Sequence, residues 1–271
     1  GGPSTGLPTK TEQSDLNQAL YGRNGEAPLI VVAASSSANC FYWAYTAAKL
    51  ALEHMTPVIL LTDGYLGNGS QLFRIPKVAD LPSITPRLAK PNDPDYRPFR
   101  RDPVSFAREW ALPGMEGLRH RVGGLEKCPD GPLTTDPENH ALMVYNRQEK
   151  VNRVANYIPD QEVTGNPDAD LLVVGWGGTS GALTLAVEEM NNEGREVAYT
   201  HFNYICPLPK NTGDIFRKYK KIVVCELNNG QFAGYLRTQF PGCSMHQYNK
   251  VMGLPFEVGE LKEAFNKILG E

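Results

Sequence analysis

The chain contains short, continuous runs of apolar residues that are separated by stretches with helical spacing. The clearest runs are residues 29–34, 58–61, 171–176, 197–202 and 222–226. Unbroken apolar runs of this length are typical of strands buried on both faces of a parallel sheet. We therefore predict two strands near the start of the chain and three in its last hundred residues, followed by a fourth over residues 245–248.

Helical periodicity occupies the intervals between these runs. Phe41, Tyr45 and Leu52 recur on one face of a helix for which Asn39 is a candidate cap, and Pro57 follows its end. Further helices are predicted over residues 181–191, 229–240 and 259–269. Strands that alternate with helices indicate an α/β fold with parallel or mixed sheets.

A glycine- and proline-rich loop opens the chain and leads into a helix that ends near Gly22. Thr9 and Glu12 have the spacing of a capping box, which predicts a helix start between them. Ser4, Thr5 and Thr9 place hydroxyl groups near that start, where an anion is favoured. The alternative is a capped turn without a ligand.

The middle of the chain has a different pattern, because residues 76–167 hold 13 of the 21 prolines. We predict an extended connecting arm with one helix, which Asp136 caps and Pro159 ends. Its charges alternate in sign over residues 93–102, which favours a solvated surface over a phosphate site. The expected organisation is a first domain over residues 1–75, the arm over 76–168 and a second domain over 169–271.

Composition and charge exclude several classes of partner. With 41% hydrophobic residues, 21% charged residues and a net charge of −3, neither nucleic acid nor an anionic membrane is an expected partner. No apolar run approaches the ~20 residues of a membrane span. The five cysteines are scattered without a Cys-x-x-Cys pair, so we expect no iron–sulfur cluster in this chain, no structural zinc, and free thiols in a cytoplasmic protein.

Several polar residues at predicted strand ends could carry chemistry. Residues 175–181 form a glycine-rich turn between a strand and a helix, but the glycine pattern of a dinucleotide site is incomplete, which favours a plain tight turn. Glu226 is either a buried general base or, as we favour, a carboxylate that caps a helix or pairs with Arg237. We expect a structural role for His201 and turn capping rather than cation binding for Asp63.

Four segments carry a resemblance to a known family. They are Gly-Pro-Ser-Thr-Gly-Leu-Pro-Thr at residues 2–9, Val-Ile-Leu-Leu-Thr-Asp-Gly-Tyr-Leu-Gly-Asn-Gly at 58–69, Pro-Leu-Pro-Lys at 207–210 and Glu-Leu-Asn-Asn-Gly-Gln-Phe-Ala-Gly-Tyr-Leu-Arg at 226–237. With these segments the chain resembles the alpha subunit of 2-oxoacid:ferredoxin oxidoreductases, in particular the 2-oxoglutarate type. The resemblance implies part of a thiamine-pyrimidine-binding domain, joined through the arm to a transketolase-C-terminal-like domain that binds no dinucleotide.

The resemblance also implies the activity, the cofactors and the partners. The reaction would be oxidative decarboxylation of a 2-oxoacid with coenzyme A, giving acyl-CoA, carbon dioxide and reduced ferredoxin. Thiamine diphosphate and Mg²⁺ would be held mainly by a partner beta subunit, an iron–sulfur cluster would lie on a partner subunit, and alpha–alpha contacts are expected. The substrate-binding residues would be Ser4, Thr5 and Thr9.

Four further residues lie in the segments 35–39 and 63–69, at the carboxyl ends of the first two predicted strands, where open α/β sheets bind ligands. The resemblance implies that they face the cofactor or the partner subunit. These residues are Ser36, Asn39, Asp63 and Asn68.

Two departures from the family pattern shape what we expect of this chain. The arginine that precedes the Gly-Gly pair in the family is absent, as are the Tyr-Pro-Ile-Thr-Pro segment and the cofactor-activating glutamate. We therefore expect the C-terminal part of a longer subunit, inactive by itself and with no catalytic residue of its own. A pyruvate or branched-chain 2-oxoacid substrate, or a role as a non-catalytic assembly module, are the alternatives.

Overall fold

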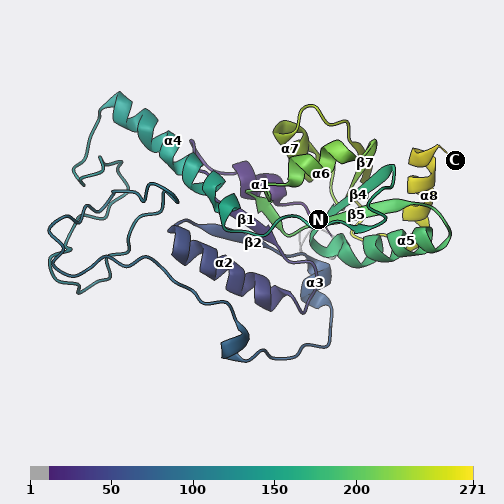
Figure 1. The fold of residues 1–271 in the computed structure, drawn as a ribbon, viewed down its shortest axis with the longest axis horizontal. Helices are drawn as coiled ribbons and strands as arrows, with labels where there is room; N and C mark the ends of the chain where they lie inside the picture. The colour runs from purple at the N-terminus through teal and green to yellow at the C-terminus, as the bar shows by residue number, and fades with distance from the viewer. Residues whose placement is uncertain (1–11, 271) are drawn as a thin grey trace.

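The computed structural model describes residues 12–270, and the predicted loop residues Ser4, Thr5 and Thr9 lie outside that range. The described chain forms two sheets with helices packed on them, which confirms the predicted α/β class (Figure 1). The helices are α1 (Leu16–Tyr21), α2 (Cys40–His54), α3 (Gly64–Asn68), α4 (Pro137–Arg153), α5 (Ser180–Asn192), α6 (Thr212–Lys218), α7 (Gln231–Gln239) and α8 (Val258–Leu269). The strands are β1 (Ile30–Ala33), β2 (Val58–Leu61), β3 (Thr164–Gly165), β4 (Leu171–Trp176), β5 (Val197–Phe202), β6 (Tyr204–Cys206), β7 (Lys221–Glu226) and β8 (His246–Asn249).

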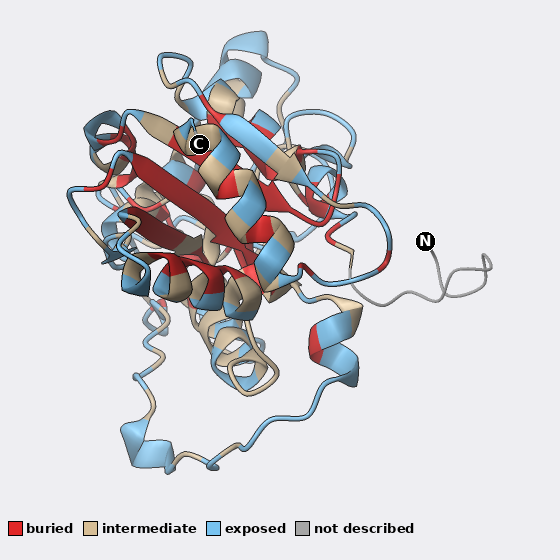
Figure 2. Ribbon diagram, turned by 90° about the vertical axis from the view of Figure 1, so that its right-hand side faces the viewer, coloured by how far each residue is buried: buried red, intermediate tan, exposed pale blue. Residues whose placement is uncertain are grey.

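The larger sheet has the strand order β3-β5-β4-β7-β8. Strand β4 pairs in parallel with β5 and with β7, and β7 pairs in parallel with β8, whereas β3 adds an antiparallel edge. Alternate side chains of β4 enter two separate cores, as the period of two in a strand requires. Leu171 and Val173 pack with α5 and α8, while Leu172 and Val174 face α7. Both faces are therefore covered (Figure 2).

The smaller sheet has the order β2-β1-β6 and contains chain segments that are far apart in the sequence. Strand β1 pairs in parallel with β2 and antiparallel with β6, which directly follows β5 of the larger sheet. Ile30 and Val32 pack against α2 and α4, whereas Val31 and Ala33 join the same core as Leu172. A single hydrophobic core thus connects the two sheets.

The segment between the two sheets leaves the body of the molecule and returns along α4 (Figure 1). A short 3₁₀ turn spans Val78–Asp80, and between it and α4 only two isolated bridges form, Leu88 with Trp110 and Lys127 with Leu133. Helix α4 begins after Asp136, whose carboxylate accepts a hydrogen bond from the backbone N–H of Glu138, as the sequence predicted.

Three sequence-based expectations differ from the structure. Helix α1 begins at Leu16 rather than beside Thr9, so the predicted capping box does not start it, because residue 13 pairs with a distant segment instead. Asn39 precedes α2 but does not cap it; its Oδ1 accepts hydrogen bonds from the backbone N–H groups of Ser35 and Ser36. Strands β3 and β6 and helices α3 and α6 were not predicted.

Candidate functional site

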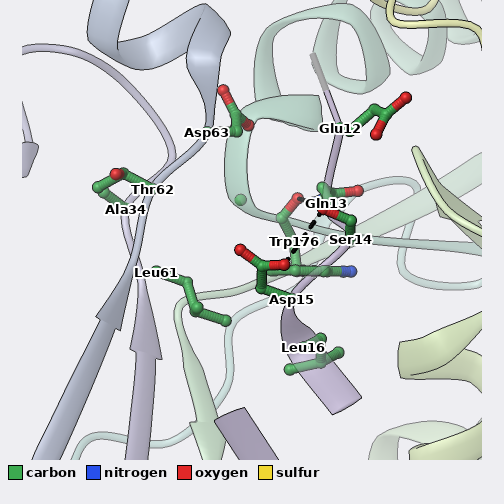
Figure 3. A pocket seen from close by; sticks show the side chains of 11 residues that line it. Glu12, Gln13, Ser14, Asp15, Leu16, Ala34, Leu61, Thr62, Asp63 and Trp176 are labelled. Atoms are coloured by element: carbon green, nitrogen blue, oxygen red, sulfur yellow. Dashed lines mark hydrogen bonds between the residues drawn. The ribbon is translucent and has the colours of Figure 1, made fainter. Parts of the chain in front are cut away.

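The carboxyl ends of β1, β2 and β4 converge with the segment that precedes α1. The small pocket at this point is lined by residues 12–16, Ala34, residues 61–63, Trp176 and Gly177 (Figure 3). Strand ends of this kind are where open α/β sheets place ligands. The residues that follow the predicted substrate loop therefore lie at the edge where function is expected.

Asp63 joins the two sheets at this edge. Its Oδ1 accepts a hydrogen bond from the N–H of Leu66 at 3.0 Å and caps α3, which confirms the predicted turn-capping role. Its Oδ2 accepts the N–H of Gly178 at 3.1 Å, 115 residues away. Burial raises the pKa of the Asp63 carboxyl, and the backbone N–H donors oppose that rise.

Gln13 is a second connection between the sheets, and the sequence analysis did not identify it. The side chain is only 4% exposed. Its Nε2 donates to the carbonyl of Trp176 at 2.7 Å, while its Oε1 accepts from the N–H of Leu227 at 2.9 Å. Its backbone N–H donates to the carbonyl of Leu227, and its carbonyl accepts from Nδ2 of Asn228. No local sequence signal predicts this set of bonds, because every partner lies more than 160 residues away.

Glu226 supports the turn that Gln13 contacts. Its carboxylate is fully buried and accepts three hydrogen bonds, from the indole N–H of Trp176 and from the backbone N–H groups of Phe232 and Ala233. Burial raises its pKa, and these donors oppose the rise. The structure confirms the predicted helix-capping role, whereas Arg237 donates to the carbonyl of Met245 rather than to Glu226.

The glycine-rich turn at residues 175–181 is explained by close approach of protein groups. A Cβ atom at Gly178 would lie 2.1 Å from Oδ2 of Asp63, and one at Gly177, where φ is +60°, would lie 2.7 Å from Nε2 of Gln13. The turn therefore needs glycine in order to admit these two side chains. This agrees with the preferred interpretation of these residues as a tight turn rather than as a dinucleotide-binding site.

A wider cleft lies next to this pocket, between the loops of the two sheets. One wall carries Ser36 and Asn68 with other polar residues of segments 35–37 and 64–71, and the other carries Leu185, Leu254 and Phe256. Two of the predicted cofactor-facing residues thus line one cleft, whereas Asp63 lines the small pocket. Asn39 does not line the cleft, but its side chain accepts hydrogen bonds from the backbone of Ser35 and Ser36, which do.

His201 is the penultimate residue of β5, and its Nδ1 lies 2.7 Å from the hydroxyl of Tyr199. Burial lowers the pKa of His201 to about 4, so the ring is neutral near pH 7. This neutral ring, bonded within its own sheet, is consistent with the structural role that the sequence favoured.

Across residues 12–270 no group of three or more His, Cys, Asp or Glu side chains is arranged to hold a metal ion. Within the same range, none of the helices has both the length and the apolar character needed to cross a membrane. The five cysteines are unpaired.

Comparisons with known proteins identify the family. Residues 1–152 match the family described as pyruvate flavodoxin/ferredoxin oxidoreductase, thiamine diphosphate-binding. The chain is 46% identical to a 2-oxoglutarate oxidoreductase subunit KorA of Mycobacterium tuberculosis over 96% of its own length and 40% of that relative. It is 30% identical to a 2-oxoglutarate synthase subunit KorA of Methanothermobacter marburgensis, over its full length and 71% of that relative.

The fold is also that of a solved relative. The 2-oxoglutarate:ferredoxin oxidoreductase of Magnetococcus marinus, solved with 2-oxoglutarate, coenzyme A and succinyl-CoA bound, superposes with a TM-score of 0.92 at 30% identity. The superposition covers 99% of this chain and 47% of the other, so the chain spans about half of that structure. This chain belongs to the family described as pyruvate flavodoxin/ferredoxin oxidoreductase, thiamine diphosphate-binding.

Proposed function

We propose that the chain is the alpha-subunit part of a 2-oxoglutarate:ferredoxin oxidoreductase. One observation carries the proposal: 99% of the chain superposes on an enzyme whose structure holds 2-oxoglutarate, coenzyme A and succinyl-CoA. The reaction is oxidative decarboxylation, in which the 2-oxoacid loses carbon dioxide, its acyl group passes to the thiol of coenzyme A, and two electrons reduce ferredoxin. Thiamine diphosphate supplies the electron sink for this chemistry when it is bound.

The cleft between the sheets has surfaces that suit a flat heteroaromatic ring such as the pyrimidine of thiamine. Leu185, Leu254 and Phe256 offer apolar contact, and the polar wall that includes Ser36 and Asn68 offers hydrogen bonds to the ring edge. In this proposal Ser36, Asn39, Asp63 and Asn68 all belong to the region that faces the cofactor or the partner subunit, and Ser36 and Asn68 line its cleft. Asp63 and Asn39 act there by holding the loops in place, because their oxygens are already bonded to backbone N–H groups.

The loop before α1 supplies the substrate contacts. We assign to the hydroxyl groups of Ser4, Thr5 and Thr9 the hydrogen bonds to the 2-oxoacid, as the family resemblance implies. Charge-assisted hydrogen bonds of this type hold a carboxylate in a fixed orientation. Because α1 begins at Leu16 with Asp15 before it, capping of that helix is not a competing role for Thr9.

The remaining components are assigned to partners of the chain. Mg²⁺ and the diphosphate of thiamine would be held mainly by a beta subunit, and an iron–sulfur cluster would lie on a partner subunit. Ferredoxin and coenzyme A act through the complex, in which alpha–alpha contacts are also expected. The five free cysteines favour a reducing, cytoplasmic location.

Two alternatives remain open to test. One is a pyruvate or branched-chain 2-oxoacid substrate, because a relative that is 30% identical to this chain is named as a 2-oxoacid:ferredoxin oxidoreductase subunit without a particular 2-oxoacid. The other is a non-catalytic module that assembles the beta subunit. Measuring the turnover of each 2-oxoacid by the complete enzyme distinguishes both alternatives from the proposal.

The decisive variants are Thr5→Ala and Thr9→Val in the complete enzyme. Loss of one hydrogen bond to a charged group costs ~1.5–3 kcal/mol, which lowers kcat/KM for the 2-oxoacid roughly 10- to 150-fold. The KM for coenzyme A and the melting temperature should stay the same, and Thr238→Val on α7 serves as the control. If both variants keep wild-type kcat/KM, the substrate role of the loop is wrong and the assembly role is favoured.

A further inference from the structure

Gln13 stands at the junction between the loop of residues 1–9 and the second sheet. All four of its hydrogen-bonding groups, two in the backbone and two in the side chain, pair with Trp176, Leu227 or Asn228. The next residues continue the same contact, because Gln231 donates to the carbonyl of Ser14 and accepts the N–H of Asn17. One backbone–backbone hydrogen bond and several side-chain hydrogen bonds thereby join the segment before α1 to the turn at residues 226–231.

We propose that Gln13 is a positioning residue, through which the turns of the larger sheet set where the loop of residues 1–9 meets the 2-oxoacid. The inference deepens the proposed function and rests on it. Thr9 is four residues before Gln13, so its Cα lies at most ~14 Å from that of Gln13 even in a fully extended chain. A fixed Gln13 therefore limits where the hydroxyl groups can reach.

The chemistry of the site suits an amide side chain. Gln13 gives a donor to the carbonyl of Trp176 and an acceptor to the N–H of Leu227, and a neutral amide offers both at once at neutral pH. A methionine of similar shape would leave the buried N–H of Leu227 unpaired. It would also remove one of the two donors to the carbonyl of Trp176, which accepts a second hydrogen bond from the hydroxyl of Thr179. A glutamate would place a charged oxygen against the carbonyl of Trp176 until the carboxyl is protonated.

The residues around Gln13 are fixed by close packing and by hydrogen bonds. Gly177 has no Cβ, which lets Nε2 approach the turn closely. Trp176 is fixed by the bond from its indole to the buried carboxylate of Glu226, and the same carboxylate holds the first turn of α7. Fully satisfied buried networks of this kind are rigid, so they can hold a neighbouring loop in place. This assigns a positioning purpose to the Glu-Leu-Asn-Asn-Gly-Gln segment, which lies outside the predicted substrate contacts.

The test uses the assembled enzyme with Gln13→Met and, from the other side of the contact, Asn228→Asp. The Asp side chain keeps the acceptor for the N–H groups of Gly230 and Gln231 but loses the donor to the carbonyl of Gln13. Gln18→Met on the exposed side of α1 is the matched control. We expect the KM for the 2-oxoacid to rise about tenfold or more in both variants, with the KM for coenzyme A unchanged.

Two further readouts separate positioning from plain destabilisation. Hydrogen exchange of the peptide spanning residues 12–21 should accelerate in Gln13→Met and stay unchanged in Gln18→Met. In Gln13→Glu the KM defect should shrink as the pH is lowered, because the protonated carboxyl again offers a donor and an acceptor. A Gln13→Met enzyme that melts lower but keeps its KM for the 2-oxoacid would show a structural role only and overturn the inference.

The comparison with the loop variants distinguishes the two proposals. If Thr5→Ala raises the KM while Gln13→Met does not, the proposed function stands and the positioning role is wrong. If neither variant changes the KM for the 2-oxoacid, the substrate role of the loop fails, and the positioning role fails with it.

Discussion

Strands β4 and β2 come from similar apolar sequences but have different surroundings. All six residues of β4 are buried, since β5 and β7 flank the strand and helices cover both faces. All four residues of β2 are only half-buried, because β2 is an edge strand with a single neighbour. The comparison teaches that an apolar run predicts a strand, whereas the number of its neighbours decides how far the strand is buried.

The contrast extends to the segments around each sheet. The segment that leads from α3 into the arm exposes Leu72, Ile75 and Val78 by 98%, 83% and 86%. In contrast, the core of the larger sheet holds Phe202, Phe216 and Phe232 at 1% exposure or less.

The largest difference is expected between two leucines in the two sheets. Leu172→Ala in β4 removes a fully buried side chain and should cost ~2–5 kcal/mol of unfolding free energy. Leu60→Ala in β2 removes a half-buried one and should cost ~1–2 kcal/mol. Urea denaturation of each variant measures the difference. Equal losses would contradict the contrast and show that β2 is buried in solution.

The next effect concerns the buried carboxylate of the larger sheet. In Glu226→Gln the NH₂ group must face either the N–H of Ala233 or the N–H of Phe232 together with the indole N–H of Trp176, so we expect a loss of ~1.5–3 kcal/mol. The control Glu263→Gln lies on the exposed side of α8 and should change stability by less than ~0.5 kcal/mol. A neutral result for Glu226→Gln would mean that the network does not hold the turn.

A smaller and pH-dependent effect is expected on the side of the smaller sheet. Lys150 in α4 donates to the carbonyl of Met55 at 2.6 Å, and burial, together with Arg101, Arg108 and Arg147, lowers its pKa from 10.5 to about 7. Between these two values the unfolded chain binds more protons at Lys150 than the folded chain does. This residue therefore makes the fold more stable as the pH rises through that window.

Lys150→Met removes this contribution. From pH 7 to pH 9 the wild-type chain should gain ~1–2 kcal/mol more stability than the variant does. Thermal melts of both proteins at the two pH values measure this difference. Parallel curves would show that Lys150 is charged and solvated in the folded protein.

The smallest effect is expected in the segment that leads into the arm. Because Leu72 is almost fully exposed, Leu72→Ser should change the stability of the chain by less than ~0.5 kcal/mol. The same denaturation measurement applies. A loss above ~1 kcal/mol would mean that this segment packs against the body of the chain in solution.

The local pattern of apolar and polar residues was sufficient to predict most of the helices and strands. The strands β2, β4 and β5 were predicted with the bounds that the structure gives, because each is a continuous apolar run between polar turns. Asp136 and Asp63 were predicted as caps because a carboxylate beside a helix start has its partners within three residues. Short elements such as α3 and β6 carry too few residues for a periodic signal.

The sequence by itself determined the fold class, the resemblance to the oxidoreductase family and the candidate loop with Thr5 and Thr9. Tertiary structure alone decided the addition of β6 to the smaller sheet, the late start of α1 and the contacts of Gln13 with Trp176 and Leu227. The physical reason is the range of the interactions. Strand and cap signals come from neighbouring residues, whereas the bonds of Gln13 join segments more than 160 residues apart and form only when both sheets share one core.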